Sequence, residues 1–202
     1  MSIITPVATL SYPHLYEPQL PDPEKPDEKP KYSCALIFAK GEDLTPMKRV
    51  AIAAAKERWG DKAEAMIRAG KLRMPFRPGE EKDYPEGSTF MNVRSINKPG
   101  IVSRIPDPTT GRPMPIVDPD DVYPGCQVKA SIGVFAYDVK GNRGVSFGLN
   151  NVQKWGDGER LDHVQKAEDE FDADPNMVAD LSDLESPTED PRADEDDISA
   201  LI

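Results

Sequence analysis

The stretch QVKASIGVFAY, residues 127–137, decides the fold class of this chain. Apolar residues occupy every second position of the stretch, at Val128, Ala130, Ile132, Val134 and Ala136. This alternation is typical of a β-strand that buries one face in a core. We therefore predict a strand here and a mainly β fold.

The opposite face of this strand carries Lys129, Phe135 and Tyr137. Proteins that hold single-stranded nucleic acid combine cationic groups, which contact phosphates, with exposed aromatic rings, on which bases stack. We therefore predict that these three residues belong to a nucleic-acid-binding face. The alternative is that the proline-rich segment before the strand covers them.

The sequence on either side of this strand predicts a hairpin and a small antiparallel barrel. Strand candidates lie at residues 3–12, where Pro13 ends the pattern, and at 32–38, 88–97, 101–104 and 144–153. Between the second and third of these, Thr45-Pro46 begins a helix that ends at Gly60, and a second short helix ends near Gly70. The helices are thus an insertion after the second strand.

Basic and aromatic residues also gather outside the central strand. The loop after the helices contains Lys71, Arg73, Phe76 and Arg77, the third strand candidate contains Phe90 and Arg94, and the hairpin contains Arg143. We predict that these residues contribute to the same binding face. The alternatives are ordinary solvated charge for the loop and a core position for Phe90.

The net charge of -11 is unevenly divided along the chain. Residues 167–202 hold 14 acidic residues and one basic residue, whereas residues 1–166 hold 22 acidic and 24 basic residues. We predict a folded DNA-binding domain over 1–166 and a disordered acidic tail over 167–202.

The last residues of the tail have a distinctive order. The acidic run Asp194, Glu195, Asp196 and Asp197 directly precedes the apolar residues Ile198, Leu201 and Ile202. An apolar tip behind negative charge is suited to docking on a partner protein, and the polyanion can compete for the protein's own DNA groove. The alternative is a solubilising appendage.

Catalytic and metal-binding patterns are weak. The chain has no phosphate-binding loop, no nucleophile elbow and no HExxH zinc motif. A nuclease metal site at Asp118, Asp120 and Asp121, or a zinc site from Cys34, Cys126, His14 and His163, lacks convincing ligand spacing. We expect no enzyme activity, no metal and no cofactor, and buried thiols rather than a disulfide.

No apolar run is long enough for a membrane span, and the N-terminus lacks the pattern of a secretory signal. We therefore expect a cytoplasmic protein without a membrane partner.

The stretch FGLNNVQKWGDGERLD, residues 147–162, followed by an acidic tail, resembles the OB-fold single-stranded-DNA-binding proteins of tailed bacteriophages. The resemblance covers most of residues 1–166. It implies an OB-like five-stranded barrel, binding of single strands without sequence preference in phage replication, recombination or repair, and a tail that contacts replication or recombination proteins. Bacterial proteins of similar function end in Pro-Phe, whereas this chain ends in Ala-Leu-Ile.

Two rival functions remain open from the sequence. One is a structural or virion interaction protein with a β-barrel core, and the other is an acidic DNA mimic that inhibits a host enzyme. Sequence patterns also leave homo-oligomerisation open.

Overall fold

The computed structural model describes residues 2–21, 23, 28–139 and 141–162. The strands are β1 (Ser2–Ile4), β2 (Ala8–Gln19), β3 (Lys31–Phe38), β4 (Arg77–Pro78), β5 (Thr89–Ser95), β6 (Gly100–Pro106), β7 (Pro113–Pro115), β8 (Gln127–Val139) and β9 (Asn142–Gly156). The helices are α1 (Thr45–Trp59) and α2 (Lys62–Arg68), which lie between β3 and β4. The mainly β fold with two helices is confirmed.

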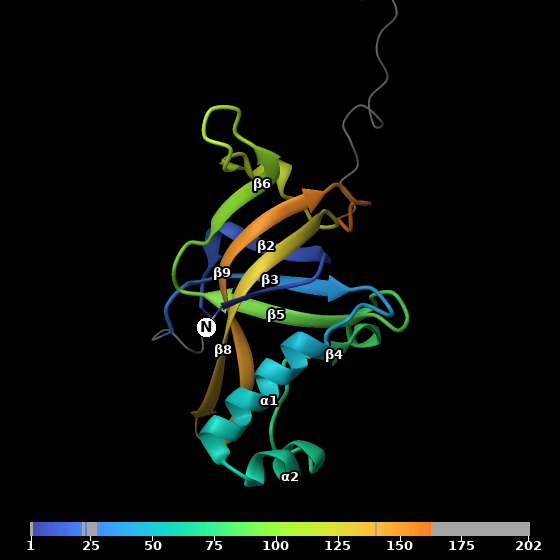
Figure 1. The fold of residues 1–202 in the computed structure, drawn as a ribbon, viewed down its shortest axis with the longest axis vertical. Coiled ribbons are helices and arrows are strands. Elements are labelled where there is room, and N and C mark those ends of the chain that lie inside the picture. The colour runs from blue at the N-terminus through green and yellow to red at the C-terminus, as the bar shows by residue number, and fades with distance from the viewer. Residues whose placement is uncertain (1, 22, 24–27, 140, 163–202) are drawn as a thin grey trace, which may run out of the picture. The chain divides into compact units, whose positions relative to one another are not determined.

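One mixed sheet contains all nine strands (Figure 1). Antiparallel pairs join β8 to β2, β2 to β3 and β3 to β5, and the long β8–β9 hairpin is antiparallel as well. However, β9 pairs in parallel with β5 and with β6. The predicted five-stranded antiparallel barrel is therefore wrong in strand direction: β9 runs antiparallel to β8, its hairpin partner, but parallel to β5 and β6 on its other edge.

The first predicted strand also differs. It is split into β1 and β2, and β2 continues through Pro13 to Gln19. The register of the β2–β3 pair shifts between Ser11 and His14, so Pro13 lies in an irregular stretch. A proline is tolerated at a bulge because no ladder hydrogen bond is required of its nitrogen.

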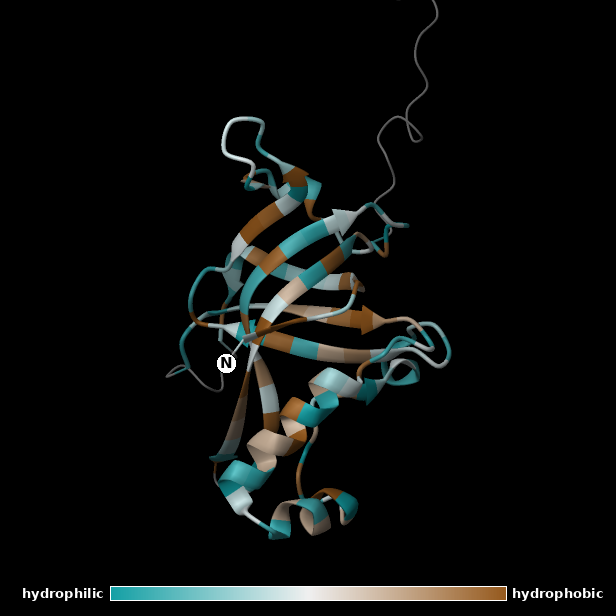
Figure 2. Ribbon diagram, viewed as in Figure 1, coloured by the Kyte–Doolittle hydropathy of each residue, from teal (hydrophilic) through white to brown (hydrophobic). Residues whose placement is uncertain are grey.

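The core lies on the inner faces of the long strands. Val128, Ala130 and Ile132 of β8 are buried, as the alternation predicted. Figure 2 shows polar and apolar residues alternating in the same way along β9. Helix α1 packs against β8 and β9 and buries Met47 and Ala51. The helix therefore supports the hairpin from the core side and leaves its other face free.

No helix among the described residues has the length and apolar character needed to cross a membrane. The predicted boundary between residues 166 and 167, and the acidic tail with its tip, lie outside the described residues.

Candidate nucleic-acid interface

A cleft of about 950 Å³ lies between β5, the far end of the β8–β9 hairpin and the loop before β4. We call it the hairpin cleft. It brings together five of the ten residues predicted to bind nucleic acid, which come from three separate parts of the chain. These five are Arg73, Arg77, Arg94, Phe135 and Tyr137.

The strand register places a ring beside a cation in this cleft. Arg94 of β5 is paired with Gly148 of β9, which is paired in turn with Gly133 of β8. The edge of the Phe135 ring lies against Gly148, since a Cβ built on that glycine would be 3.8 Å from the Phe135 Cε1 atom. Phe135 nevertheless remains 49% exposed. The ring thus presents an open surface next to the Arg94 strand.

The loop that supplies Arg73 is held against the hairpin by its backbone. The Arg73 N–H donates to the Arg143 carbonyl oxygen at 3.0 Å, and the Arg73 carbonyl accepts from the Val145 N–H at 2.9 Å. Gly144, between these two partners, has no room for a side chain. The loop and the hairpin therefore form one wall of the cleft.

The charges that line the cleft are mostly positive. Arg73 and Arg94 are exposed and form no ion pair within the described part of the chain. Arg77 forms an ion pair with Glu81, and Lys31 with Glu28 at 2.7 Å. The two guanidinium groups without such pairs are available to phosphates.

Lys129 lies away from the cleft, although it points to the same side of β8 as Phe135. The two residues are six positions apart, which is about 20 Å along a strand. The Lys129 Nζ atom lies 3.7 Å from the centre of the Trp155 ring, in a cation–π contact. The alternation of β8 placed Lys129 and Phe135 on one side of the strand but could not show that only Phe135 lines the cleft.

Both Phe76 and Phe90 are packing residues in this structure. Phe90 is only 1% exposed, with the Tyr84 ring edge-on at 5.4 Å and the Arg77 guanidinium at 5.2 Å from its ring centre. Phe76 packs edge-on against the buried Phe147 at 5.9 Å. Phe90 therefore offers no open stacking face, whereas Phe76 is partly buried against the core and does not line the cleft.

Two further predicted cations are placed near the cleft but do not line it. Lys71 is exposed beyond α2. Arg143 forms an ion pair with Asp138 at 2.8 Å, which offsets its charge.

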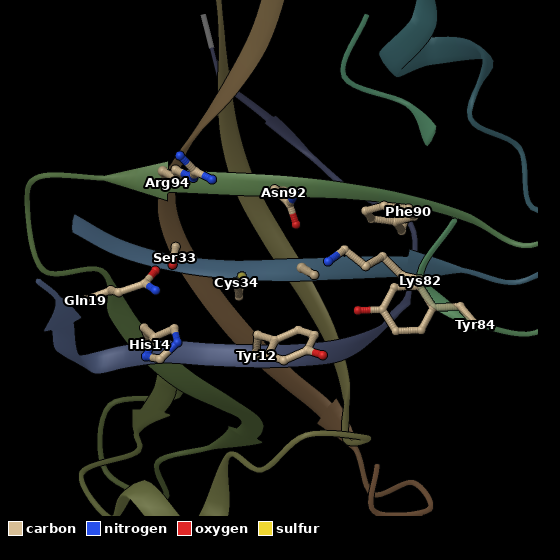
Figure 3. A pocket seen from close by; sticks show the side chains of 11 residues that line it. Tyr12, His14, Gln19, Ser33, Cys34, Lys82, Tyr84, Phe90, Asn92 and Arg94 are labelled. Carbon is tan, nitrogen blue, oxygen red and sulfur yellow. The ribbon is translucent and has the colours of Figure 1, made fainter. Parts of the chain in front are cut away.

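A smaller cavity of about 260 Å³ lies on the outer face of β2, β3 and β5 (Figure 3). Its lining includes Tyr12, His14, Ser33 and Tyr84, and it shares Asn92 and Arg94 with the hairpin cleft. Tyr12 and His14 were not predicted as site residues, because the predicted strand ended at Pro13 whereas β2 continues to Gln19. The alternation of Tyr12 and His14 across that proline is the signal that could have indicated them.

Within the described residues, no three or more His, Cys, Asp or Glu side chains are grouped so as to hold a metal ion. The Asp118 side chain accepts a hydrogen bond from the backbone of Asp120, as in an ordinary turn. Cys34 and Cys126 are free, buried thiols. Burial raises the pKa of Cys34 to about 12 and that of Cys126 to about 11. Such thiols are poor nucleophiles and poor metal ligands at neutral pH.

The sequence matches the family described as Enterobacter phage Enc34, ssDNA-binding protein, over residues 1–182. A comparison with curated proteins gave no match. Among solved structures, the single-stranded DNA-binding protein from bacteriophage Enc34 in complex with ssDNA has 21% identity and a TM-score of 0.58, and the match covers 80% of this chain and 89% of that chain. The bacteriophage T7 single-stranded DNA binding protein gp2.5 has 14% identity and a TM-score of 0.55, with 82% and 97% covered. The structural likenesses show a shared fold.

Proposed function

Since the chain belongs to the family of the Enterobacter phage Enc34 single-stranded-DNA-binding protein, we propose that it binds single-stranded DNA in the hairpin cleft, without sequence preference. The observation that carries this proposal is the convergence of exposed cations with an exposed ring: Arg73 and Arg94 lie in one cleft with Phe135. Phosphates need the cations and unstacked bases need the ring. Charge contacts to phosphates and stacking on a ring both tolerate any base, which supports binding without sequence preference.

An OB-type barrel is part of the same proposal. It is supported by the order of the strand pairings, in which β8–β2, β2–β3, β3–β5, β5–β9 and β9–β8 return to the first strand. A closed set of five strands has no free edge within the ring. The cleft then lies across the outer surface of that ring.

The proposal includes a biological role, which the binding chemistry and the family support. A protein that coats exposed strands acts in phage DNA replication, recombination or repair within the infected bacterial cell, and it needs no catalytic group or cofactor for this. The acidic residues of 167–202 compete with DNA for the cleft, and the tip at 194–202 docks a partner protein in that process. The charge division along the sequence supports both parts of this role.

The test is a fluorescence-anisotropy titration of labelled oligo-dT with the full-length protein. Neutralising several phosphates releases counterions, so the affinity should fall steeply between about 50 and 300 mM NaCl. Removal of residues 167–202 should raise the affinity at low salt. A protein that shows no binding to oligo-dT at low salt would instead be a virion component, and loss of all activity with the tail would indicate a DNA mimic.

The location of the site is tested by Phe135→Ala. Loss of one stacked base should weaken binding by about 1–3 kcal/mol, which is about 5-fold to about 100-fold. Ile105→Ala removes a comparably exposed apolar side chain outside both cavities and should leave the affinity unchanged. Equal affinities for the two variants would place the DNA elsewhere.

A further inference from the structure

The smaller cavity on the outer face of β2, β3 and β5 is lined by residues whose conformation and exposure are not explained by packing of the fold. We call it the Tyr12 pocket. Tyr12 is 64% exposed, and its backbone has a φ of 46°. Left-handed backbone costs a residue other than glycine of order 1 kcal/mol. The bulge in β2 thus holds a large ring in solvent, and neither burial nor a regular ladder offsets the cost.

Three polar side chains around this ring have no hydrogen-bond partner among the described residues. His14, Gln19 and Asn92 line the pocket, and their side chains form no hydrogen bond with any described residue. Figure 3 shows Tyr12 and His14 along β2, and Asn92 and Arg94 along β5 on the far side of β3. The three polar side chains offer both donors and acceptors to a ligand that is flat and polar at its edge.

Tyr84 forms another wall of the pocket and is held by contacts of its own. The Tyr84 hydroxyl donates to Ser11 Oγ at 3.0 Å, and its ring packs on the buried Phe90. The cavity of about 260 Å³ is close to the lower limit of about 300 Å³ for ligand pockets, so it fits one small ring system rather than a chain. Phe90 thereby supports the pocket from below.

The pocket and the hairpin cleft are adjacent. Both are lined by Asn92 and Arg94, which stand on the outer face of β5. Two interstrand spacings separate β5 from β2, so Tyr12 is about 10 Å from this shared row. A strand that leaves the cleft over Arg94 can reach Tyr12 within a few nucleotides.

We propose that the Tyr12 pocket is a second base-binding subsite for single-stranded DNA. The strand in the hairpin cleft crosses β5 at Arg94, which holds a phosphate, and places a later base on the Tyr12 ring with its edge toward His14, Gln19 and Asn92. This inference rests on the proposed function and adds the path of the strand and a second stacking position.

Two titrations test the subsite in the full-length protein. Oligo-dT of increasing length should gain affinity in a step when it becomes long enough to reach Tyr12. In Tyr12→Ala that step should be lost, with affinity for long oligonucleotides about 5-fold to about 100-fold lower and affinity for short ones unchanged. Tyr12→Phe retains the ring and should keep the step.

Gln19→Glu serves as a second variant, because it keeps the shape of the side chain and adds a negative charge at a residue that lines the pocket and not the cleft. Its cross-strand partner Lys31 lines the cleft, so this variant should weaken binding of long oligonucleotides more than that of short ones. Quenching of 2-aminopurine, placed at successive positions of the long oligonucleotide, should reveal two stacked segments. Phe135→Ala should abolish one of them and Tyr12→Ala the other.

The outcomes separate the two proposals. If the wild-type protein binds no oligonucleotide of any length, the proposed function fails. If it binds and Tyr12→Ala and Gln19→Glu retain the full length dependence, the Tyr12 subsite is overturned while the hairpin cleft stands.

Discussion

The carbonyl oxygen of Arg73 accepts a 2.9 Å hydrogen bond from the backbone N–H of Val145. This bond joins the loop after the helices to the start of β9, two segments that are distant in sequence. It depends on Gly144, where a Cβ would lie 2.5 Å from the Arg73 carbonyl oxygen and 2.8 Å from the Tyr137 hydroxyl. One glycine therefore sets the distance between two cleft residues.

We expect Gly144→Ala to reduce both stability and DNA affinity. The new methyl group must displace the Arg73 backbone or the Tyr137 ring, and overpacking of this kind costs about 1–3 kcal/mol. Gly156→Ala is the matched control in the same strand, because a Cβ there meets nothing within 4 Å. Urea unfolding and oligo-dT titration of both variants measure the effects. Equal behaviour of the two variants would contradict the role assigned to Gly144.

Much of this fold could be predicted from the sequence, because local periodicity reports local structure. The alternation of residues 127–137 placed Phe135 and Tyr137 on the outer face of β8 correctly. The parallel pairing of β5 with β9 could not be predicted in this way. The local sequence of a strand does not indicate which distant strand will pair with it.

The cleft was predicted in part for the same reason. Arg73 and Arg94 were selected by residue type, and the structure brings them together with Phe135. Phe90 and Lys129 satisfied the same criterion, but the burial of one and the Trp155 contact of the other arise from tertiary packing. Residue type alone cannot distinguish a ring that binds a base from a ring that packs under a loop.

We expect Arg94→Gln to weaken oligo-dT binding and to change its salt dependence. Because Arg94 lies in both cavities and has no ion pair among the described residues, its loss removes one phosphate contact. The slope of the logarithm of affinity against the logarithm of salt concentration should become shallower by about 0.7 for this single-stranded ligand. Arg112→Gln, an exposed arginine outside both cavities, is the control. An unchanged slope for Arg94→Gln would show that this guanidinium does not contact a phosphate.

We expect Lys129→Ala to alter Trp155 more than DNA binding. The ammonium group sits over the indole ring, and loss of such a contact costs about 0.5–1 kcal/mol at exposed sites. The tryptophan emission spectrum should shift, while the affinity for oligo-dT should fall less than in Arg94→Gln at the same salt concentration. A larger loss of affinity than in Arg94→Gln would show that Lys129 contacts the DNA.

The buried thiols predict a loss of stability at high pH. Burial raises the pKa of Cys34 from 9.0 to about 12, with a smaller contribution from the nearby Cys126. Above pH 9 the unfolded chain releases the Cys34 proton and the folded chain retains it, so the free energy of unfolding falls as the pH rises. One thiol contributes a slope of about 1.4 kcal/mol per pH unit, which is present above about pH 9 and ends near the folded-state pKa.

Urea unfolding at pH 8, 10 and 11 measures this effect. The free energy of unfolding should decline less with pH for Cys34→Ala than for the wild type, although Cys34→Ala is less stable at neutral pH. Identical declines would mean that the thiolate of Cys34 is tolerated in the folded core.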